Sequence, residues 1–163
     1  SNGNYCALGL LIEDVTGQPL DEAARTLLFD PIAVTGAHLT TGGQLPTDVG
    51  YRSGVDRLAR LGGAGTFLIS TDDLAATLSS ITPLDRKSMT WPGVFGDQYG
   101  WGHTGSVTDA QSCVWLLESD RTVVAATIAG NSPGTGGGVC DRIVPALAAD
   151  LGFPAGTPDR SPP

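Results

Sequence analysis

The chain has 163 residues, of which 40% are hydrophobic and 16% are charged, a composition typical of one globular domain or of a large piece of one. Its formal net charge of −8 argues against nucleic acids and anionic membrane surfaces as partners, because both require clustered Lys and Arg. No apolar run approaches the ~20 residues that a membrane-spanning helix needs. A helical pattern begins almost at the first residue, so we expect a further segment in front of this sequence.

Two helices are predicted in the first thirty residues. Residues 4–16 show apolar residues at helical spacing, and Gly17 follows where a left-handed C-cap belongs. Pro19 suits the first turn of a second helix over about 19–29. Repeated Gly and Pro predict irregular structure over 30–60. The first stripe consists of Tyr5, Leu8, Leu11, Ile12 and Val15, and the inner side of the second helix of Leu20, Ala23, Ala24, Leu27 and Leu28.

A third helix is predicted within residues 62–81, after a glycine-rich turn and a short apolar run. Ser70 or Thr71 caps it, and Asp72 and Asp73 in its first turn complement the helix dipole. These two carboxylates therefore need no catalytic explanation.

Strands dominate the last part of the chain. Three consecutive antiparallel strands are predicted over 98–108, 111–119 and 121–130, followed by a closing helix over 139–151. The apolar face expected for this helix comprises Ile143, Val144, Leu147 and Leu151. We therefore predict one domain part over 1–153 and a Pro-rich mobile tail over 154–163.

Three cysteines, Cys6, Cys113 and Cys140, do not have metal-ligand spacing, and we expect neither a metal site nor a cofactor. Cys113 lies on a predicted strand and Cys140 opens a predicted helix, so a disulfide between them is sterically possible. The alternative is three buried free thiols. A disulfide would contribute roughly 3 kcal/mol and would place the protein in an oxidising compartment.

The loop GNSPGTGGGV over 130–139 matches two catalytic or binding motifs only superficially. Its G-x-S-x-G pattern fails as a nucleophile elbow, because Pro133 has no backbone N–H to donate to an oxyanion. As a phosphate cradle it lacks the G-K-[ST] ending, and Val139 replaces the last glycine of a dinucleotide fingerprint. We interpret it as a connector.

The stretch GWGHTGSV over 100–107 is the strongest candidate site. On a core strand these positions are usually bulky and β-branched, whereas the small residues Gly100, Gly102 and Gly105 would leave an open surface for a ligand. The His103 ring and the Thr104 hydroxyl would then face that ligand or its neighbours. Outside this stretch, we interpret His38 as an exposed surface residue and Trp91 and Trp101 as packing residues.

Three stretches together resemble the branch of class C β-lactamases, D-alanyl-D-alanine carboxypeptidases and related esterases in the serine β-lactamase and penicillin-binding protein superfamily. SNGNY with ALGLLIEDVTGQPLDE looks like that branch's Tyr-x-Asn motif and the helix behind it. GGAGTFLISTDDLAATLSSI looks like its glycine-rich approach to a helix, and GHTGSV like its Lys-Thr-Gly or His-Thr-Gly motif. The likeness runs from residue 1 to about 151. It implies an α+β fold, an antiparallel sheet flanked by helices, of which this chain is the C-terminal part.

The resemblance implies a role for each matching residue. Asn2 would hydrogen-bond the acyl-side amide of the substrate, and His103 would take the electrostatic role of the usual lysine. Thr104 would bind the substrate carboxylate beside Gly105, and the backbone N–H of Ser106 would form half of an oxyanion hole. One such donor contributes roughly 2.7–4 kcal/mol of transition-state stabilisation.

The sequence departs from the family at the nucleophile. The family's Ser-x-x-Lys is absent, since Leu84 stands three residues before Lys87, the single lysine. The tyrosine that should precede Ser1 is also absent, and Tyr5 lies too far along to replace it. Histidine in place of lysine predicts weaker carboxylate attraction and a dependence on mildly acidic pH. We expect this chain to be inactive alone.

Two functions from different classes follow. The first is the C-terminal portion of an extracellular or cell-envelope serine hydrolase, acting through an acyl-enzyme on a D-alanyl peptide, a β-lactam or an ester. It would require a complementing N-terminal segment, or else self-associate, because half of such a sheet exposes an edge strand and apolar surface. The second is a non-catalytic module that binds a peptide or cell-wall fragment along residues 102–107.

Overall fold

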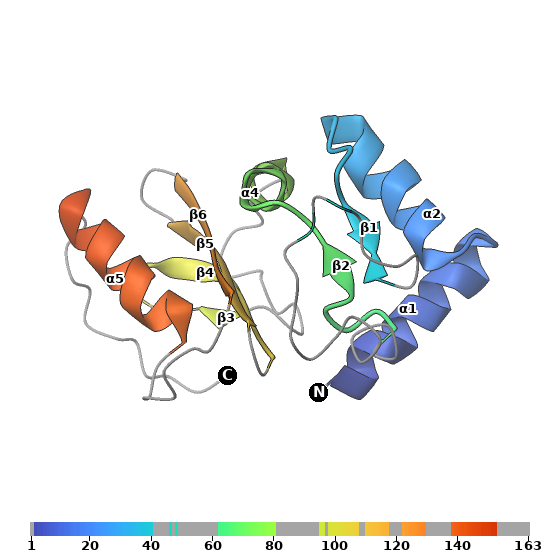
Figure 1. Cartoon of the computed structure of the whole chain (residues 1–163), viewed down its shortest axis with the longest axis horizontal. Helices are drawn as coiled ribbons and strands as arrows, with labels where there is room; N and C mark the ends of the chain where they lie inside the picture. The colour runs from blue at the N-terminus through green and yellow to red at the C-terminus, as the bar shows by residue number, and fades with distance from the viewer. Residues whose placement is uncertain are drawn as a thin grey trace. The chain divides into compact units, whose positions relative to one another are not determined.

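The computed structural model describes residues 2–40, 46, 48, 62–80, 95, 96, 98–107, 110–117, 122–129 and 138–152 (Figure 1). The chain forms two compact units, Ser1–Thr77 and Leu78–Pro163. Within the described ranges, no helix combines the length and the apolar character that crossing a membrane requires. The predicted tail over 154–163, most of the predicted connector over 130–139 and residues 118–121 lie outside these ranges.

The first unit begins with the two predicted helices, α1 (Asn2–Thr16) and α2 (Leu20–Ala24). Gly17 adopts the expected left-handed conformation with φ of 67°, which confirms its role at the end of α1. The backbone N–H of Leu20 donates to Oε1 of Glu13 at 2.9 Å. A side chain from α1 thereby satisfies one of the open N–H groups at the start of α2.

The second helix buries its expected side only in its first part, where Leu20 and Ala23 are buried. After Ala24 the chain continues as a π-helical turn, Arg25–Phe29, and a 3-10 turn, Asp30–Ile32. Leu27 and Leu28 are exposed, and Phe29 is buried in their place. The prediction for these two leucines is wrong because π-helical turns have a wider repeat than the α-helix, which rotates later residues around the axis.

A small core holds this unit together. Phe29 packs with Val34 and Ala37, and its ring meets that of Phe67 edge-on, with centroids 5.6 Å apart. Two short antiparallel strands that the sequence analysis did not predict, β1 (His38–Leu39) and β2 (Phe67–Leu68), lie beside this core.

The apolar stripe of α1 is exposed. Between 40% and 75% of the surface of Leu8, Leu11, Ile12 and Val15 is accessible, and Gly9 is the buried residue of this helix. A Cβ at Gly9 would lie 3.2 Å from both the Gly63 backbone and Leu20, so α1 packs closely through its glycine. The large apolar residues of this helix remain exposed.

The second unit is built on a four-stranded antiparallel sheet with the order β3-β4-β5-β6. The strands β4 (Gly100–Val107), β5 (Ala110–Leu117) and β6 (Thr122–Ala129) confirm the three predicted strands. The short edge strand β3 (Phe95–Gly96) was not predicted, because two residues carry no periodic signal.

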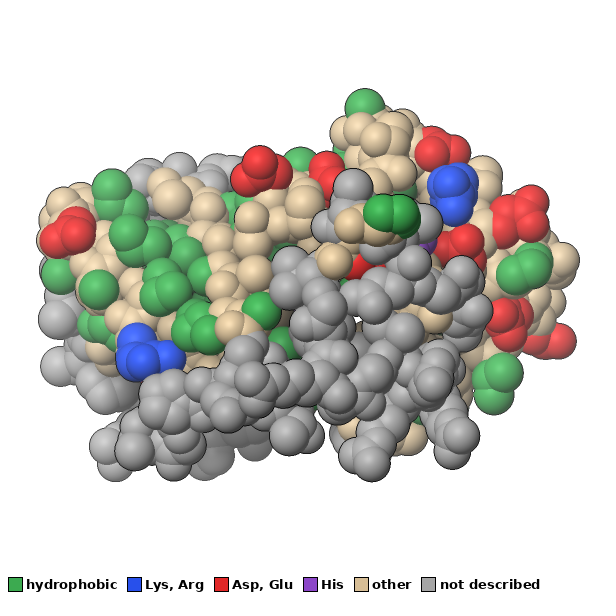
Figure 2. Space-filling model, viewed as in Figure 1, with side chains coloured by type: hydrophobic (Ala, Val, Ile, Leu, Met, Phe, Trp, Pro, Cys, Tyr) green, Lys and Arg blue, Asp and Glu red, His purple; other side chains and the backbone are tan. Residues whose placement is uncertain are grey.

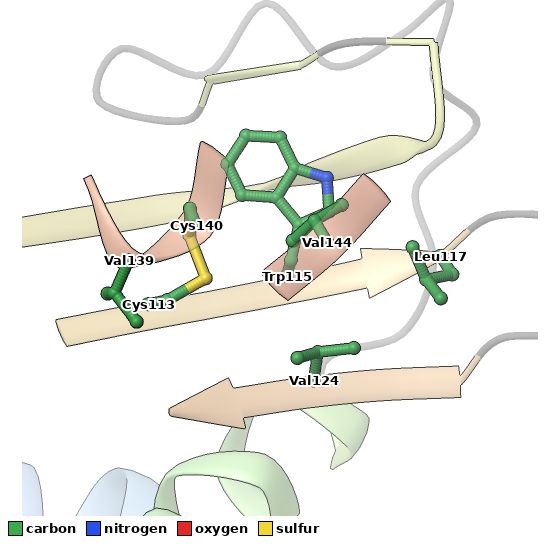
Figure 3. Packing of buried hydrophobic residues seen from close by; sticks show 7 residues of the cluster. All are labelled: Cys113, Trp115, Leu117, Val124, Val139, Cys140 and Val144. Atoms are coloured by element: carbon green, nitrogen blue, oxygen red, sulfur yellow. A yellow bond between two sulfur atoms is a disulfide. The ribbon is translucent and has the colours of Figure 1, made fainter. Parts of the chain in front are cut away.

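Hydrophobic side chains pack on both faces of this sheet. The first face carries Cys113, Trp115 and Leu117 from β5, which pack against Val139, Cys140 and Val144 of α5 (Val139–Asp150) (Figure 3). The opposite face carries Trp101 and Leu116, which pack against Leu78 of α4 (Thr71–Ser80). The Ser70 hydroxyl accepts the Asp73 N–H at 3.0 Å, which identifies Ser70 as the residue that caps α4. The predicted packing role of Trp101 is confirmed.

A disulfide joins Cys113 of β5 to Cys140 in the first turn of α5, with the two Cα atoms 5.2 Å apart. Cys6 does not take part in a disulfide. Because the bridge holds the start of α5 on the sheet, the buried stripe of the helix runs through Cys140, Val144 and Ala148. The expected burial of Leu147 and Leu151 is wrong: both are exposed, and Figure 2 shows hydrophobic side chains gathered over α5.

Candidate active-site strand

Burial changes along β4. Its first three residues, Gly100–Gly102, are buried, whereas the side chains from His103 to Val107 are half-buried or exposed. The residues of the predicted His-Thr-Gly motif therefore lie in the accessible half of a strand whose other half is anchored in the core. Such an arrangement presents polar groups on a rigid backbone.

The glycines of β4 differ in what an added side chain would meet. A Cβ at Gly102 would lie 2.8 Å from the Cα of Trp115 and would overlap the Val114 carbonyl oxygen, and one at Gly100 would overlap that of Leu116. Both glycines are required by the close approach of the β5 backbone. The expectation that they open the strand to a ligand is wrong.

Gly105 differs from the other two. An added Cβ there would collide with the Ser112 Oγ, the end of a side chain that can rotate, while the next nearest atom lies at 3.7 Å. At this position the strand is free of backbone crowding from β5. Of the three glycines, Gly105 therefore fits the predicted open surface.

The register of the sheet separates His103 from Thr104. His103 lies opposite Val114, and Thr104 lies opposite Cys113. Cys113 belongs to the face that α5 covers, so Thr104 and Ser106 project on that face and His103 on the other. The expectation that His103 and Thr104 face one ligand across an open surface is corrected, because successive side chains alternate. Both can reach one ligand only at the edge of the strand.

Among the described residues, only part of that edge has a partner strand. In the described pairing, β3 lies opposite only Trp101 and Gly102. No described strand pairs with residues 104–107 on the side away from β5. The predicted Ser106 N–H donor, which would serve a substrate lying along this edge, stays a prediction.

Asn2 is the first residue of α1 and is exposed. It belongs to the first unit and His103 to the second, so their proximity stays a prediction. Trp91 and Lys87 lie outside the described residues. In the described parts of the chain, no group of three or more His, Cys, Asp and Glu side chains has an arrangement that would hold a metal ion.

His38 is corrected from an exposed surface residue to a half-buried structural one. It begins β1, and 16% of its side chain is exposed. Its Nδ1 lies 3.1 Å from the Gly36 carbonyl oxygen and its Nε2 3.2 Å from Oδ2 of Asp48. The sequence analysis missed this contact because Asp48, ten residues away, belongs to no recognisable motif.

The fold of the chain is α+β, with an antiparallel sheet packed against helices, and it resembles part of a β-lactamase-like fold. The solved structure of D-amino acid amidase from Ochrobactrum anthropi SV3 matches with a TM-score of 0.61 at 18% identity, covering 83% of this chain. The same amidase complexed with L-phenylalanine amide matches with a TM-score of 0.62 at 17% identity.

This chain spans about half of the amidase, 51% of its length in both structures. No protein-family model and no curated protein matches the sequence. The fold prediction is thus confirmed by structural likeness, and at this level of identity the likeness concerns the fold.

Proposed function

We propose that this chain is the C-terminal portion of a serine hydrolase that works through an acyl-enzyme on a D-alanyl peptide, a β-lactam or an ester. The observation that carries the proposal is the placement of His103, Thr104 and Gly105 in the accessible half of β4 within a β-lactamase-like fold. Without this fold, the motif is only a weak indication of a hydrolase.

The residues of this stretch have separate roles in the proposed site. The Ser106 backbone N–H donates to the oxyanion that forms on the scissile carbonyl, and a strand holds such a donor in place before the reaction begins. Thr104 and Gly105 bind the substrate along the edge, and His103 acts electrostatically from the other face. Asn2 hydrogen-bonds the acyl-side amide of the substrate in the proposed reaction.

The nucleophile of this hydrolase comes from a complementing polypeptide that carries Ser-x-x-Lys, since this sequence contains no such motif. Two surfaces support a complementing segment: the exposed stripe Leu8, Leu11, Ile12 and Val15 on α1, and the exposed Leu147 and Leu151 on α5. Exposed apolar surface of this extent is typical of an interaction site. The disulfide supports an extracellular or cell-envelope location.

Labelling with a fluorophosphonate or a fluorescent penicillin tests the proposal. This chain mixed with a polypeptide carrying Ser-x-x-Lys is expected to be labelled, and this chain alone is not. Ser106→Pro removes the proposed donor and should slow acylation about 10²–10³-fold, whereas Ser106→Ala keeps the N–H and most of the rate. Labelling of this chain alone would contradict our account of the nucleophile.

The alternative is a non-catalytic module that binds a peptide or cell-wall fragment along residues 102–107. This sequence contains no Ser-x-x-Lys, and no described strand pairs with residues 104–107 on the side away from β5. Both observations fit a binding module as well as they fit a hydrolase portion. The two functions differ in one result: a binding module retains peptide affinity and is never labelled, whichever polypeptide is added.

A further inference from the structure

The face of the sheet that carries His103 changes from apolar to polar along its length. Trp101 and Leu116 are buried at one end of this face. At the other end, Gly105 of β4 lies opposite Ser112 of β5, and both are half-buried. Since β5 is paired with a strand on each side, a half-buried Ser112 means that no element fully covers this end of the face. We call the surface formed by His103, Gly105 and Ser112 the His103 face.

The hydroxyl of Ser112 leans from β5 over β4. A Cβ built on Gly105 would lie 3.7 Å from the Cβ of Ser112 and closer still to its Oγ. The Oγ therefore projects toward the edge of β4, into the space that a side chain at position 105 would fill. Among the described residues this oxygen has no hydrogen-bond partner, and it is not buried. A ligand at the edge of β4 can thus reach the Ser112 hydroxyl across Gly105.

The two faces of β4 differ in charge. On the α5 side, Thr104 and Asp141 line a pocket of about 460 Å³, and no Lys or Arg is among its described lining residues. An acidic side chain there repels an anionic group of a ligand. On the His103 face, no described residue of β4, β5 or β6 is acidic. His103 and Ser112 are diagonal neighbours on this face, a Cα separation of about 7–8 Å that one carboxylate can bridge.

We propose that Ser112 is a further substrate-binding residue of the acyl-transfer site, and that its hydroxyl donates to a substrate carboxylate lying over Gly105 on the His103 face. This contact takes the place of the one that the resemblance assigns to Thr104, whose side chain projects on the same side as Asp141. The inference rests on the proposed function and narrows its substrate: a D-alanyl peptide or a penicillin carries such a carboxylate, and a simple ester does not. Gly105 is required because any side chain there would separate the carboxylate from Ser112.

A two-dimensional ¹⁵N NMR titration of the full 163-residue chain tests the contact. The probes are N-acetyl-D-alanyl-D-alanine, which ends in a carboxylate, and its C-terminal amide, which matches it in size and lacks the charge. We expect the carboxylate to bind at least about tenfold more tightly than the amide and to move the backbone signals of Gly105 and Ser112. Ser112→Ala should weaken carboxylate binding about tenfold, the effect of losing one hydrogen bond to a charged group, and change amide binding less than about twofold.

The matched control is Thr127→Val. Thr127 lies opposite Ser112 on the next strand, and its hydroxyl donates to the Gln111 carbonyl oxygen at 3.1 Å, so this variant should bind both probes as the unsubstituted chain does. Ser112→Thr keeps a hydroxyl and should retain carboxylate binding within about threefold. The proposal is overturned if the unsubstituted chain does not prefer the carboxylate, or if Ser112→Ala spares carboxylate binding or weakens both probes alike. It is also overturned if Thr127→Val or Ser112→Thr binds the carboxylate as weakly as Ser112→Ala.

The failure of this inference is distinct from that of the proposed function. Labelling of the complemented protein without a preference for the carboxylate would remove the Ser112 contact and leave the hydrolase. Carboxylate binding that depends on Ser112, without labelling, would leave the contact and favour the binding module.

Discussion

The two halves of β4 show how one residue type serves opposite purposes on a single strand. In the first half, Gly100 and Gly102 are buried because the β5 backbone passes where their Cβ atoms would be. In the second half, Gly105 faces only a serine hydroxyl, and Thr104 and Ser106 are exposed. The first half of the strand packs in the core, and the second half has accessible side chains. A glycine in a strand thus indicates that another group approaches the backbone closely. Only the structure shows whether that group is a neighbouring strand or a ligand.

The largest effect expected from this comparison is that of Gly102→Ala. Its new Cβ would overlap backbone atoms, which cannot rotate away, so we expect a loss of at least about 3 kcal/mol in the unfolding free energy of the second unit. Urea unfolding followed by tryptophan fluorescence measures it, since all three tryptophans belong to Leu78–Pro163. A variant as stable as the parent would show that the close approach to β5 is not a packing requirement.

The disulfide lies beside the second half of β4, because Cys113 is directly opposite Thr104. Replacing both Cys113 and Cys140 by Ala should lower the unfolding free energy by about 3–4 kcal/mol, given their sequence separation of 27 residues. The same urea titration measures the loss. Reduction of the unsubstituted chain with dithiothreitol is the control and should give a similar destabilisation; a loss below about 1 kcal/mol would contradict the expectation.

Gly105→Ala is the matched counterpart of Gly102→Ala. The Ser112 hydroxyl can rotate away from the new methyl group, so we expect a change of no more than about 1 kcal/mol. Adding Ser112→Ala should remove most of this change. If Gly105→Ala were as damaging as Gly102→Ala, the distinction between the two halves would be lost.

Thr104→Val should have the smallest effect on stability. The side chain is exposed and the substitution preserves its shape, so we expect a change within about 0.5 kcal/mol. In the labelling experiment on the complemented protein, the same variant should lose affinity, because the hydroxyl is proposed to contact the substrate. A large loss of stability would mean that Thr104 is a structural residue.

Much of the fold was predictable because its signals are local. Apolar spacing, the left-handed Gly17 and the cap at Ser70 located α1 and α4, and alternation located β4 to β6. The buried faces were less predictable. In the π-helical turn Phe29 is buried, and Leu27 and Leu28 are exposed. In α5, which the disulfide holds on the sheet, the buried stripe includes Ala148.

The candidate site, too, was predictable only in part. The stretch from His103 to Ser106 was recognisable as a motif, yet the opposite orientations of His103 and Thr104 follow from the register with β5. Ser112 carried no signal of its own, because a lone serine in a strand matches no motif. Its place over Gly105 became visible only when β5 was paired with β4.

By itself, the sequence located α1, α4, α5 and the strands β4 to β6, and it identified the short stretch of β4 whose polar groups we propose for acyl transfer. Those properties depend on neighbours a few residues apart. Only the tertiary structure decided which side chains are covered, why Gly100 and Gly102 have no side chain, and where a pocket opens beside Thr104. These depend on strand register and on a disulfide between residues 27 apart, which bring together groups that no local pattern relates.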